Sequence, residues 1–330
     1  MTAGRDLATL PKAHLHLHLE GAMRPATLSD LAAIHQMTVP PIRGFADFGA
    51  FVGMYRAACE VLVGEAELRR LVREVVEDAA ADGVTWVEPA FYPPNHLERW
   101  GTNAASTEIV LDELISAGAQ LGVGVGLVVA ADRTVDPSEA LDLARLAARY
   151  AVAGFPVVGF GLANDEVGHP PEPFAAAFAI AREAGLLAVP HGGELEGPDS
   201  VRGCLDACGA HRVMHGVRAV EDPSLVARLA DEGICLDVCP SSNVALGVVP
   251  RLEDHPLPRL LEAGVPCSLN ADDPLLFGPG ILAEYQLCRD RLGLDDEHLA
   301  GIAAASIAAS GAPDNLKKSA QAAVEAWRCS

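Results

Sequence analysis

Three histidines alternate with leucines near the start of the chain, in the segment HLHLHLEG at residues 14–21. Strict alternation is typical of a β-strand, so the imidazoles of His14, His16 and His18 are expected on one face. Two histidines one residue apart on a strand can bind the same metal ion, because their side chains run parallel at a short spacing. The segment therefore predicts a metal-binding strand. The alternative is a half-buried strand with histidines on its polar face.

Further candidate ligands follow short apolar segments downstream. The segments are HGGE at residues 191–194, MHGV at 214–217 and NADDP at 270–274. Three imidazoles and one carboxylate are a suitable ligand set for zinc, with one position left for water. The predicted metal ligands are His16, His18, His191 and Asp272.

These residues need a scaffold that brings distant strand ends together. Short apolar strands alternate with helices along the chain, which implies parallel pairing and right-handed crossovers. Eight such strands predict an α/β fold, a closed (β/α)8 TIM barrel forming a single domain over residues 1–330. In such a barrel the reactive groups gather at the carboxyl ends of the strands. The expected strands are 14–19, 84–88, 123–130, 157–162, 187–191, 212–216, 234–238 and 266–270.

Helices are expected between these strands and after the last one. A proline in the first turn and a glycine after the last are typical helix boundaries in this chain. The C-terminal helices are expected to pack outside the barrel. The expected helices are 25–36, 66–82, 104–120, 137–153, 172–184, 199–208, 222–232, 256–263, 283–291 and one from 297 onward.

Composition excludes several classes of partner. Of the 330 residues half are hydrophobic and 21% are charged, which suits a large core, and the net charge of −21 would repel nucleic acid and anionic membranes. The sequence has neither a signal peptide pattern nor an apolar run of about 18 residues. Its eight cysteines form no CxxC pair, so reduced thiols in a cytoplasmic protein are expected.

The motifs together resemble those of the adenosine deaminase family, within the larger amidohydrolase group. The segments that carry the resemblance are HLHLHLEG, GLANDE, HGGE, MHGV and LNADDPLLFG. The resemblance implies a TIM barrel with one zinc ion per chain, held by the four predicted ligands. No lysine lies in residues 159–163, where many two-metal amidohydrolases carry one, and this favours a single metal.

The resemblance also implies roles for further residues. Glu194 becomes the proton-handling acid beside the purine ring, and His215 the base or electrostatic partner of the attacking water. Asp273 is expected to hydrogen-bond the imidazole edge of the purine. Asn164 stands where the family often has glycine, and asparagine is well able to adopt the left-handed turn needed there. Glu20 replaces the aspartate that faces the ribose 5′-hydroxyl.

The chemistry of a 6-aminopurine fits these roles. Its ring is a poor electrophile, and zinc lowers the pKa of bound water from 15.7 towards about 7, which supplies hydroxide to attack C6. A carboxyl whose pKa is raised by burial can then protonate the neighbouring ring nitrogen. The expected activity is zinc-dependent hydrolytic deamination of adenosine and 2′-deoxyadenosine to inosine and ammonia.

The substrate is the least determined expectation. Segments 92–96, 166–171, 215–218 and 254–258, together with Glu20, resemble the adenine deaminase branch, whereas 162–166 and 273–278 are closer to adenosine deaminases. The nucleoside is favoured over the free base. Adenine deamination to hypoxanthine, deamination of a modified nucleoside, and nucleoside binding without turnover are the alternatives.

Several residues near the expected site have two interpretations. Phe48 and Phe51 form either an apolar lid over the substrate or ordinary helix packing. His96 and His169 are expected in surface loops near the site. His14 points to the same face as the ligands but matches none of them, so a hydrogen-bonded structural role is expected.

Overall fold

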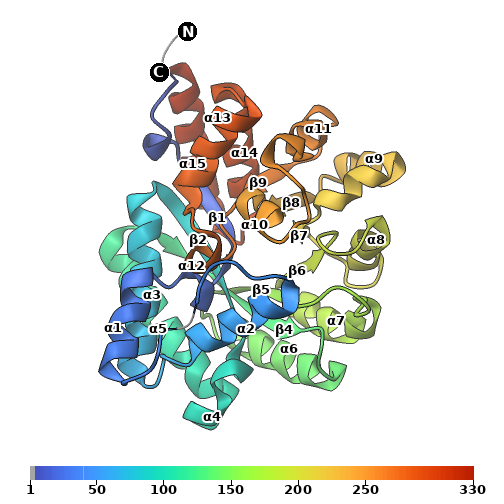
Figure 1. Ribbon diagram of the computed structural model, residues 1–330. Coiled ribbons are helices and arrows are strands. Elements are labelled where there is room, and N and C mark those ends of the chain that lie inside the picture. The colour runs from blue at the N-terminus through green and yellow to red at the C-terminus, as the bar shows by residue number, and fades with distance from the viewer. Residues whose placement is uncertain (1–3, 40) are drawn as a thin grey trace.

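The computed structural model describes residues 4–39 and 41–330, and it contains a nearly closed barrel of parallel strands (Figure 1). Hydrogen-bonded neighbours follow the order β1-β2-β4-β5-β6-β7-β8-β9, with the two-residue β3 also paired to β2. An isolated parallel bridge between Leu17 and Asp272 joins the first strand to the segment after the last. The expected TIM barrel is confirmed. The strands are β1 (Lys12–His18), β2 (Val84–Phe91), β3 (Gly124–Val125), β4 (Leu127–Asp132), β5 (Val157–Ala163), β6 (Leu187–Gly192), β7 (Arg212–His215), β8 (Cys235–Val238) and β9 (Cys267–Leu269).

Helices surround the strands and make the crossovers between them (Figure 1). Four helices follow the last strand, and the last three of them cover one side of the barrel. In the described part of the chain no helix is long and apolar enough to cross a membrane. The helices around the outside of the barrel are α1 (Pro25–Ile34), α3 (Glu65–Ala81), α5 (Asn103–Leu121), α6 (Pro137–Val152), α7 (Ala175–Glu183), α8 (Pro198–Asp206), α9 (Pro223–Glu232), α11 (Leu257–Glu262), α13 (Ile281–Leu292), α14 (Asp296–Ala309) and α15 (Asp314–Cys329).

The expected third strand, 123–130, is divided. It forms β3 and β4, separated by Gly126. A methyl group on residue 126 would lie 2.7 Å from Val158 and 2.8 Å from Trp86, so only glycine fits here without movement of its neighbours. The backbone continues across the break, because Gly126 N–H still donates to Val87 C=O.

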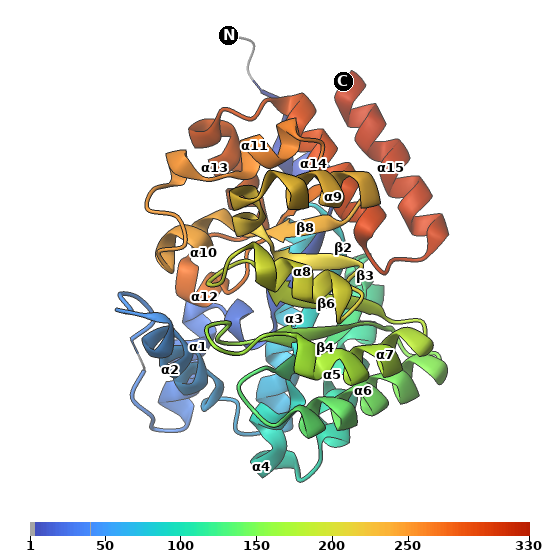
Figure 2. The ribbon, with the colours of Figure 1, turned by 90° about the vertical axis from the view of Figure 1, so that its right-hand side faces the viewer.

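Four more helices stand at the carboxyl ends of the strands. They are α2 (Phe48–Cys59), α4 (Leu97–Trp100), α10 (Pro240–Ala245) and α12 (Pro274–Phe277). Figure 2 places α2, α10 and α12 at the same end of the molecule. Their presence at this end means that helices, rather than open loops, surround the mouth of the barrel.

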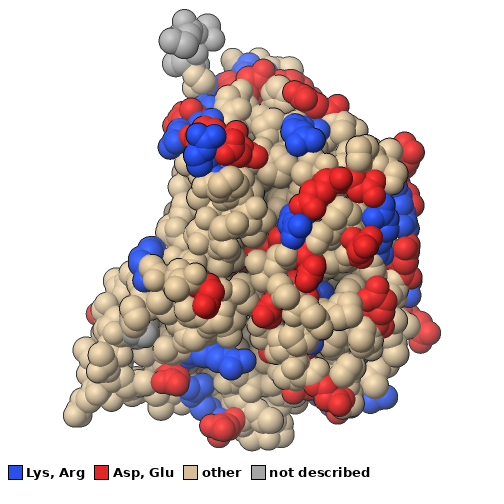
Figure 3. Space-filling model, turned by 45° about the vertical axis from the view of Figure 1, so that its right-hand side comes forward, with Lys and Arg blue, Asp and Glu red and all other residues tan. Residues whose placement is uncertain are grey.

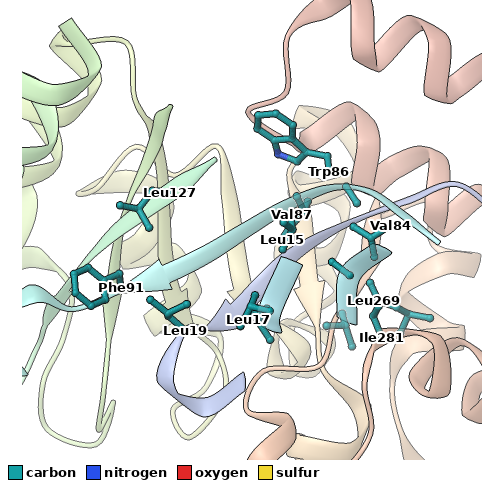
Figure 4. Close-up of a cluster of buried hydrophobic side chains, with 14 of the residues drawn as sticks. Leu15, Leu17, Leu19, Val84, Trp86, Val87, Phe91, Leu127, Leu269 and Ile281 are labelled. Atoms are coloured by element: carbon teal, nitrogen blue, oxygen red, sulfur yellow. The ribbon is translucent and has the colours of Figure 1, made fainter. Parts of the chain in front are cut away.

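The alternation of β1 divides its side chains between two environments. Leu15, Leu17 and Leu19 pack outward among apolar residues of β2, β9 and α13, as Figure 4 shows. Inside the barrel a separate small apolar cluster comes from β2, β4, β6 and β7. Its members are Ala90, Val128, Val189 and Met214. The histidines of β1 therefore lie on the inner side, above a filled barrel.

A buried ion-pair network also lies inside the barrel. Arg212 on β7 contacts Glu88 on β2 and Asp237 on β8, and all three side chains are fully buried. Because each charge has an opposite partner, the network satisfies polar groups that would otherwise be costly to bury. On the outer surface, acidic side chains are spread over the face drawn in Figure 3, in keeping with the net charge of −21.

Candidate active site and metal centre

Four side chains from β1, β6 and the end of β9 converge at the mouth of the barrel. One ligand atom each from His16, His18, His191 and Asp272 lies within 4.8 Å of the others. The Nε2 atoms of His16 and His18 lie 3.2 and 3.3 Å from Asp272 Oδ1, and those of His18 and His191 lie 3.2 Å apart. Tetrahedral ligands about 2.05 Å from a zinc ion would be roughly 3.3 Å from one another. The spacing of these atoms therefore fits a zinc ion held by the four residues.

The second ring nitrogens of two of these histidines determine their tautomers. His16 Nδ1 donates to Asp237 C=O at 3.1 Å, and His191 Nδ1 donates to Leu162 C=O at 2.9 Å. Because a carbonyl can only accept, each Nδ1 carries the proton and each Nε2 presents its lone pair to the cluster. Burial, followed by the nearby histidines, holds the pKa of His191 well below its usual value. The ring is therefore neutral, as a metal ligand must be.

The backbone of Asp272 joins the segment after the last strand to the first strand of the barrel. Its N–H donates to His16 C=O, and its C=O accepts from His18 N–H. Its backbone is left-handed, with φ of 59°, an uncommon conformation outside glycine that aspartate tolerates. Burial opposes ionisation of Asp272, but the contacts of its carboxylate with His16 and His18 outweigh it and hold its pKa well below the usual value. The carboxylate therefore stays charged beside the imidazoles.

Glu194 and His215 face each other at the edge of this cluster. Glu194 Oε1 lies 3.3 Å from His215 Nε2, which in turn lies 3.8 Å from Asp272 Oδ2. Burial, followed by the charges of Asp272 and Glu166, raises the pKa of Glu194 well above its usual value. A carboxyl in this environment keeps its proton near neutral pH and can act as an acid.

The loop that carries Glu194 is held by a second carboxyl. Glu166 accepts hydrogen bonds from the N–H groups of four consecutive residues, at 2.6 to 3.0 Å, and also contacts the hydroxyl of Ser200. Gly193 turns the chain with φ of 66°. The four donors are Gly193, Glu194, Leu195 and Glu196. Glu166 therefore sets the backbone from which the candidate acid projects.

Asp273 is the next buried acid at the site. Burial, followed by the charge of Asp272, raises its pKa well above the usual value. Its Oδ1 has no hydrogen-bond partner among the described residues, so it is free for a ligand. Gly21 leaves room for this atom, because a methyl group on residue 21 would lie 1.7 Å from Asp273 Oδ1.

A cavity opens above the metal cluster and includes most of the predicted site residues. Helix α2 contributes an apolar wall in which Phe48 and Phe51 take part, so these two residues both pack in a helix and cover the cavity. Asn164 has φ of 79°, which confirms the expected left-handed turn, and donates to Asp132 at 2.7 Å. The lining includes His18, Phe48, Phe51, Val52, Tyr55, Arg56, Tyr92, Asn95, Asp132, Asn164, His191, Glu194, His215, Asp272 and Asp273.

Glu20 occupies a different place from the one expected. It is 1% exposed and lies behind the cavity wall, where Tyr55 donates to its Oε2 at 2.8 Å. His96 Nε2 donates to its Oε1 at 2.6 Å. The expectation that His96 belongs to a surface loop was wrong: its side chain is fully buried, because the carboxyl of Glu20 requires a partner. His169, by contrast, lies in the partly exposed turn after β5.

His14 is separate from the cluster. Its Nε2 accepts a hydrogen bond from Ala271 N–H at 3.2 Å, in agreement with the expected structural role. The sequence interpretation missed Arg56 and Asp132, which line the cavity, and Asn243, which contacts His215. Asp132 ends β4, so its place at a strand end was a usable signal. Nothing in the local pattern around Asn243 indicated a contact with His215.

Comparison with known proteins identifies the family. The sequence model of the adenosine deaminase family matches residues 11–327. The chain belongs to the adenosine deaminase family. A relative from Streptomyces virginiae, named as an adenosine/adenine deaminase, is 47% identical in an alignment of 338 positions that covers 99% of each chain. This family member is thus a hydrolase of purine-ring C–N bonds.

Solved structures resemble this family member over almost its whole length. An adenine deaminase from Arthrobacter aurescens has a TM-score of 0.90 and 32% identity, covering 97% of this chain and 99% of the other. An amidohydrolase from Burkholderia ambifaria, solved with bound zinc, has a TM-score of 0.87 and 28% identity, covering 98% and 92%. The barrel described above is therefore the fold of known deaminases.

Proposed function

We propose that this chain hydrolyses the free base adenine to hypoxanthine and ammonia. The proposal rests chiefly on Glu20, the residue expected to face a ribose. Both of its carboxyl oxygens already have donors, Tyr55 and His96, and its side chain is shielded from the cavity. A buried carboxyl with both oxygens paired would have to break a hydrogen bond before it could bind a sugar hydroxyl, which is costly.

The wall in front of Glu20 supports the same substrate. Phe48, Phe51 and Val52 line the cavity from α2 and form an apolar surface beside Tyr55 and Arg56 of the same helix. The flat face of an aromatic base gains from contact with these three side chains, whereas a ribose hydroxyl placed against them would lack a partner. The solved adenine deaminase from Arthrobacter aurescens adds support from the comparisons. The proposal therefore reverses the preference for a nucleoside drawn from the sequence.

The site residues divide the chemistry among themselves. A zinc ion held by His16, His18, His191 and Asp272 would supply the Lewis acidity that lowers the pKa of water towards about 7. Glu194 holds a proton beside the ring and donates it to N1 as oxygen adds to C6. Asp273 hydrogen-bonds the imidazole edge of the base. Water and adenine are consumed, the C6–N6 bond breaks, and hypoxanthine and ammonia are formed.

A comparison of substrates tests the proposal. The purified zinc-loaded protein is assayed for ammonia release from adenine, adenosine and 2′-deoxyadenosine under identical conditions. We expect kcat/KM for adenine to exceed that for either nucleoside by at least about 100-fold. The sugar hydroxyls of a nucleoside would lose their hydrogen bonds to water without gaining equivalent ones from the protein. Equal or faster turnover of adenosine, or turnover confined to another 6-aminopurine, would overturn the proposal.

A variant pair links this result to Glu20. Glu20→Asp shortens the side chain by one methylene, so its carboxyl cannot reach both Tyr55 and His96. We expect the ratio of adenosine to adenine turnover to rise in this variant. Glu98→Asp, the same change at an exposed residue of α4, is the matched control and should leave the ratio unchanged.

A further inference from the structure

Behind His215 lies a chain of buried hydrogen bonds that ends at a backbone amide. Asn243 of α10 is 0% exposed and His255, just after the 3-10 helix Leu252–Asp254, is 4% exposed. Asn243 Nδ2 lies 3.2 Å from His215 Nδ1, and Asn243 Oδ1 lies 3.1 Å from His255 Nε2. Leu257 N lies 3.1 Å from His255 Nδ1. Unlike His215, the residues Asn243, His255 and Leu257 do not line the cavity.

The amide of Leu257 determines every proton position in this chain. A backbone N–H can only donate, so His255 Nδ1 must be the acceptor and its ring proton must be on Nε2. That proton is donated to Asn243, which requires the Asn243 oxygen to face His255 and its NH2 group to face His215. Burial lowers the pKa of His255 to about 4, so the ring carries one proton at neutral pH.

The last step of this chain reaches the active site. Because the Asn243 NH2 group donates to His215 Nδ1, that nitrogen is unprotonated, and the ring proton of His215 must be on Nε2. This atom faces Glu194 Oε1 at 3.3 Å and Asp272 Oδ2 at 3.8 Å. His215 therefore presents an N–H, and not a lone pair, to the region where oxygen adds to C6.

The two metal-site histidines with known backing partners show the opposite arrangement. His16 and His191 donate from Nδ1 to carbonyl oxygens, so their Nε2 atoms are free to bind a cation. His215 lies only 4.5 Å from His16 between ring centroids, close enough to compete for the same ion. The group that contacts Nδ1 thus distinguishes these histidines. A carbonyl acceptor leaves Nε2 of His16 and His191 free to bind a metal ion, whereas the amide donor of Asn243 leaves the proton of His215 on Nε2.

We propose that Asn243 and His255 are positioning residues that hold His215 as its Nε2–H tautomer. In this state His215 is kept out of the metal site and donates a hydrogen bond to the oxygen that adds to the purine. The inference rests on the proposed deaminase function, but it concerns residues outside the substrate cavity. It also decides between the two roles, base or electrostatic partner, that the sequence left open for His215.

The tautomer can be measured directly. The holoenzyme is prepared with 15N-labelled histidine, and the ring nitrogens of His215 are assigned by comparison with His215→Gln. We expect a protonated Nε2 and an unprotonated Nδ1 in the unmodified protein. Asn243→Asp replaces the donor by a carboxylate of the same shape, and we expect the His215 proton to move to Nδ1. A protonated Nδ1 in the unmodified protein would overturn the proposal.

Kinetics of the same variants provide the second readout. We expect Asn243→Asp to lower kcat by at least about 100-fold with little change in KM, because His215 would lose its N–H towards the reacting oxygen. His255→Gln can still donate to Asn243 and should keep kcat within about tenfold of the unmodified protein, whereas His255→Phe should not. Unchanged kcat and tautomer in Asn243→Asp, or equal loss in both His255 variants, would contradict the relay.

The two proposals fail in different ways. If the unmodified protein turns over no 6-aminopurine but His215 carries its proton on Nε2, the proposed function is wrong and the relay is supported. If adenine is turned over while the NMR spectrum shows Nδ1–H, the relay is wrong and the function is supported.

Discussion

At the scale of single residues, the absence of a side chain at Gly21 leaves space for the carboxyl group of Asp273. Gly21 follows Glu20 directly, and its α-hydrogen faces Asp273, the buried acid with a free Oδ1. A side chain on residue 21 would occupy the same space as this oxygen. The glycine of HLHLHLEG is therefore needed for Asp273 as much as for the turn that ends β1.

Substitution of Gly21 tests this contact. In Gly21→Ala the new methyl group would lie 1.7 Å from Asp273 Oδ1, so the carboxyl must move away from the cavity. We expect kcat/KM for adenine to fall by about 100-fold, because a misplaced group loses its hydrogen bond to the base. Steady-state kinetics measure this, and metal analysis of the same sample should still give zinc.

Gly49→Ala is the matched control for this prediction. Gly49 lies on α2, and a methyl group there would meet only Asp47, at an ordinary 3.4 Å. Its kcat/KM should stay within a factor of about two. Wild-type kinetics in Gly21→Ala would show that Asp273 is not held in place by this contact.

At the scale of elements, neighbouring strands support one another's loops. Glu166 belongs to the segment after β5, yet it holds four backbone N–H groups of the loop after β6. Charge-assisted hydrogen bonds of this kind contribute about 1.5 to 3 kcal/mol each when a partner is removed. The position of the candidate acid Glu194 thus depends on a loop residue 28 positions earlier in the sequence.

Glu166→Gln replaces one of these acceptor oxygens by an NH2 group, which would face donors. We expect the variant to lose about 3 kcal/mol of unfolding free energy and at least about tenfold in kcat. The new NH2 group would face backbone N–H groups that had donated to the carboxylate, so these hydrogen bonds would be lost. Urea unfolding and steady-state kinetics measure the two effects. Glu172→Gln, at an exposed residue of the next 3-10 helix, should change neither. A variant with normal stability and kcat would contradict the assigned support.

The elements also show what the sequence could predict. The strand starting at Val84 and the helix starting at Pro137 were expected within a few residues, because apolar periodicity, proline and glycine act locally. Helices α2, α10 and α12 were not, because their formation depends on packing against the mouth of the barrel. His96 was misplaced for the same reason: its burial depends on Glu20, which is 76 residues away in the sequence.

The candidate site followed a similar division. His16, His191 and Asp272 were predictable because each occupies a strand end within a distinctive motif, and strand ends meet in a barrel. Asn243 was not predictable, because its importance comes from one contact with His215 across the molecule. Tautomers are a property of hydrogen-bond partners, and these appear only when the chain is folded.

At the scale of the whole molecule, carboxyl groups inside an acidic protein make stability depend on pH. Glu284 on α13 is 1% exposed, and its Oε2 accepts from Ser241 N–H at 3.4 Å. Burial raises its pKa to about 8, although hydrogen bonding to Ser241 opposes the shift. In the unfolded chain a glutamate ionises near pH 4.3. Between these two values the folded protein holds a proton that the unfolded chain has released.

This difference fixes the sign of the effect. Where the folded state binds more protons than the unfolded state, the free energy of unfolding falls as pH rises. The contribution of Glu284 is therefore complete below about pH 4.3, declines up to about pH 8, and is constant above that. Glu284→Gln cannot ionise and keeps an oxygen for Ser241, so its stability should decline less between pH 5 and pH 8. We expect the unfolding free energy of the variant, relative to that of the unmodified protein, to be about 3 kcal/mol more favourable at pH 8 than at pH 5.

Denaturant unfolding at pH 5, 6.5 and 8 measures this shift, with the same zinc content in both proteins. Glu262→Gln removes an exposed carboxyl at the end of α11 and should give a curve parallel to that of the unmodified protein. Parallel curves for Glu284→Gln would mean that Glu284 ionises alike in both states, so water would have to reach it inside the fold. A shift of the expected sign would instead assign part of the molecule's loss of stability between pH 5 and pH 8 to the carboxyl of Glu284.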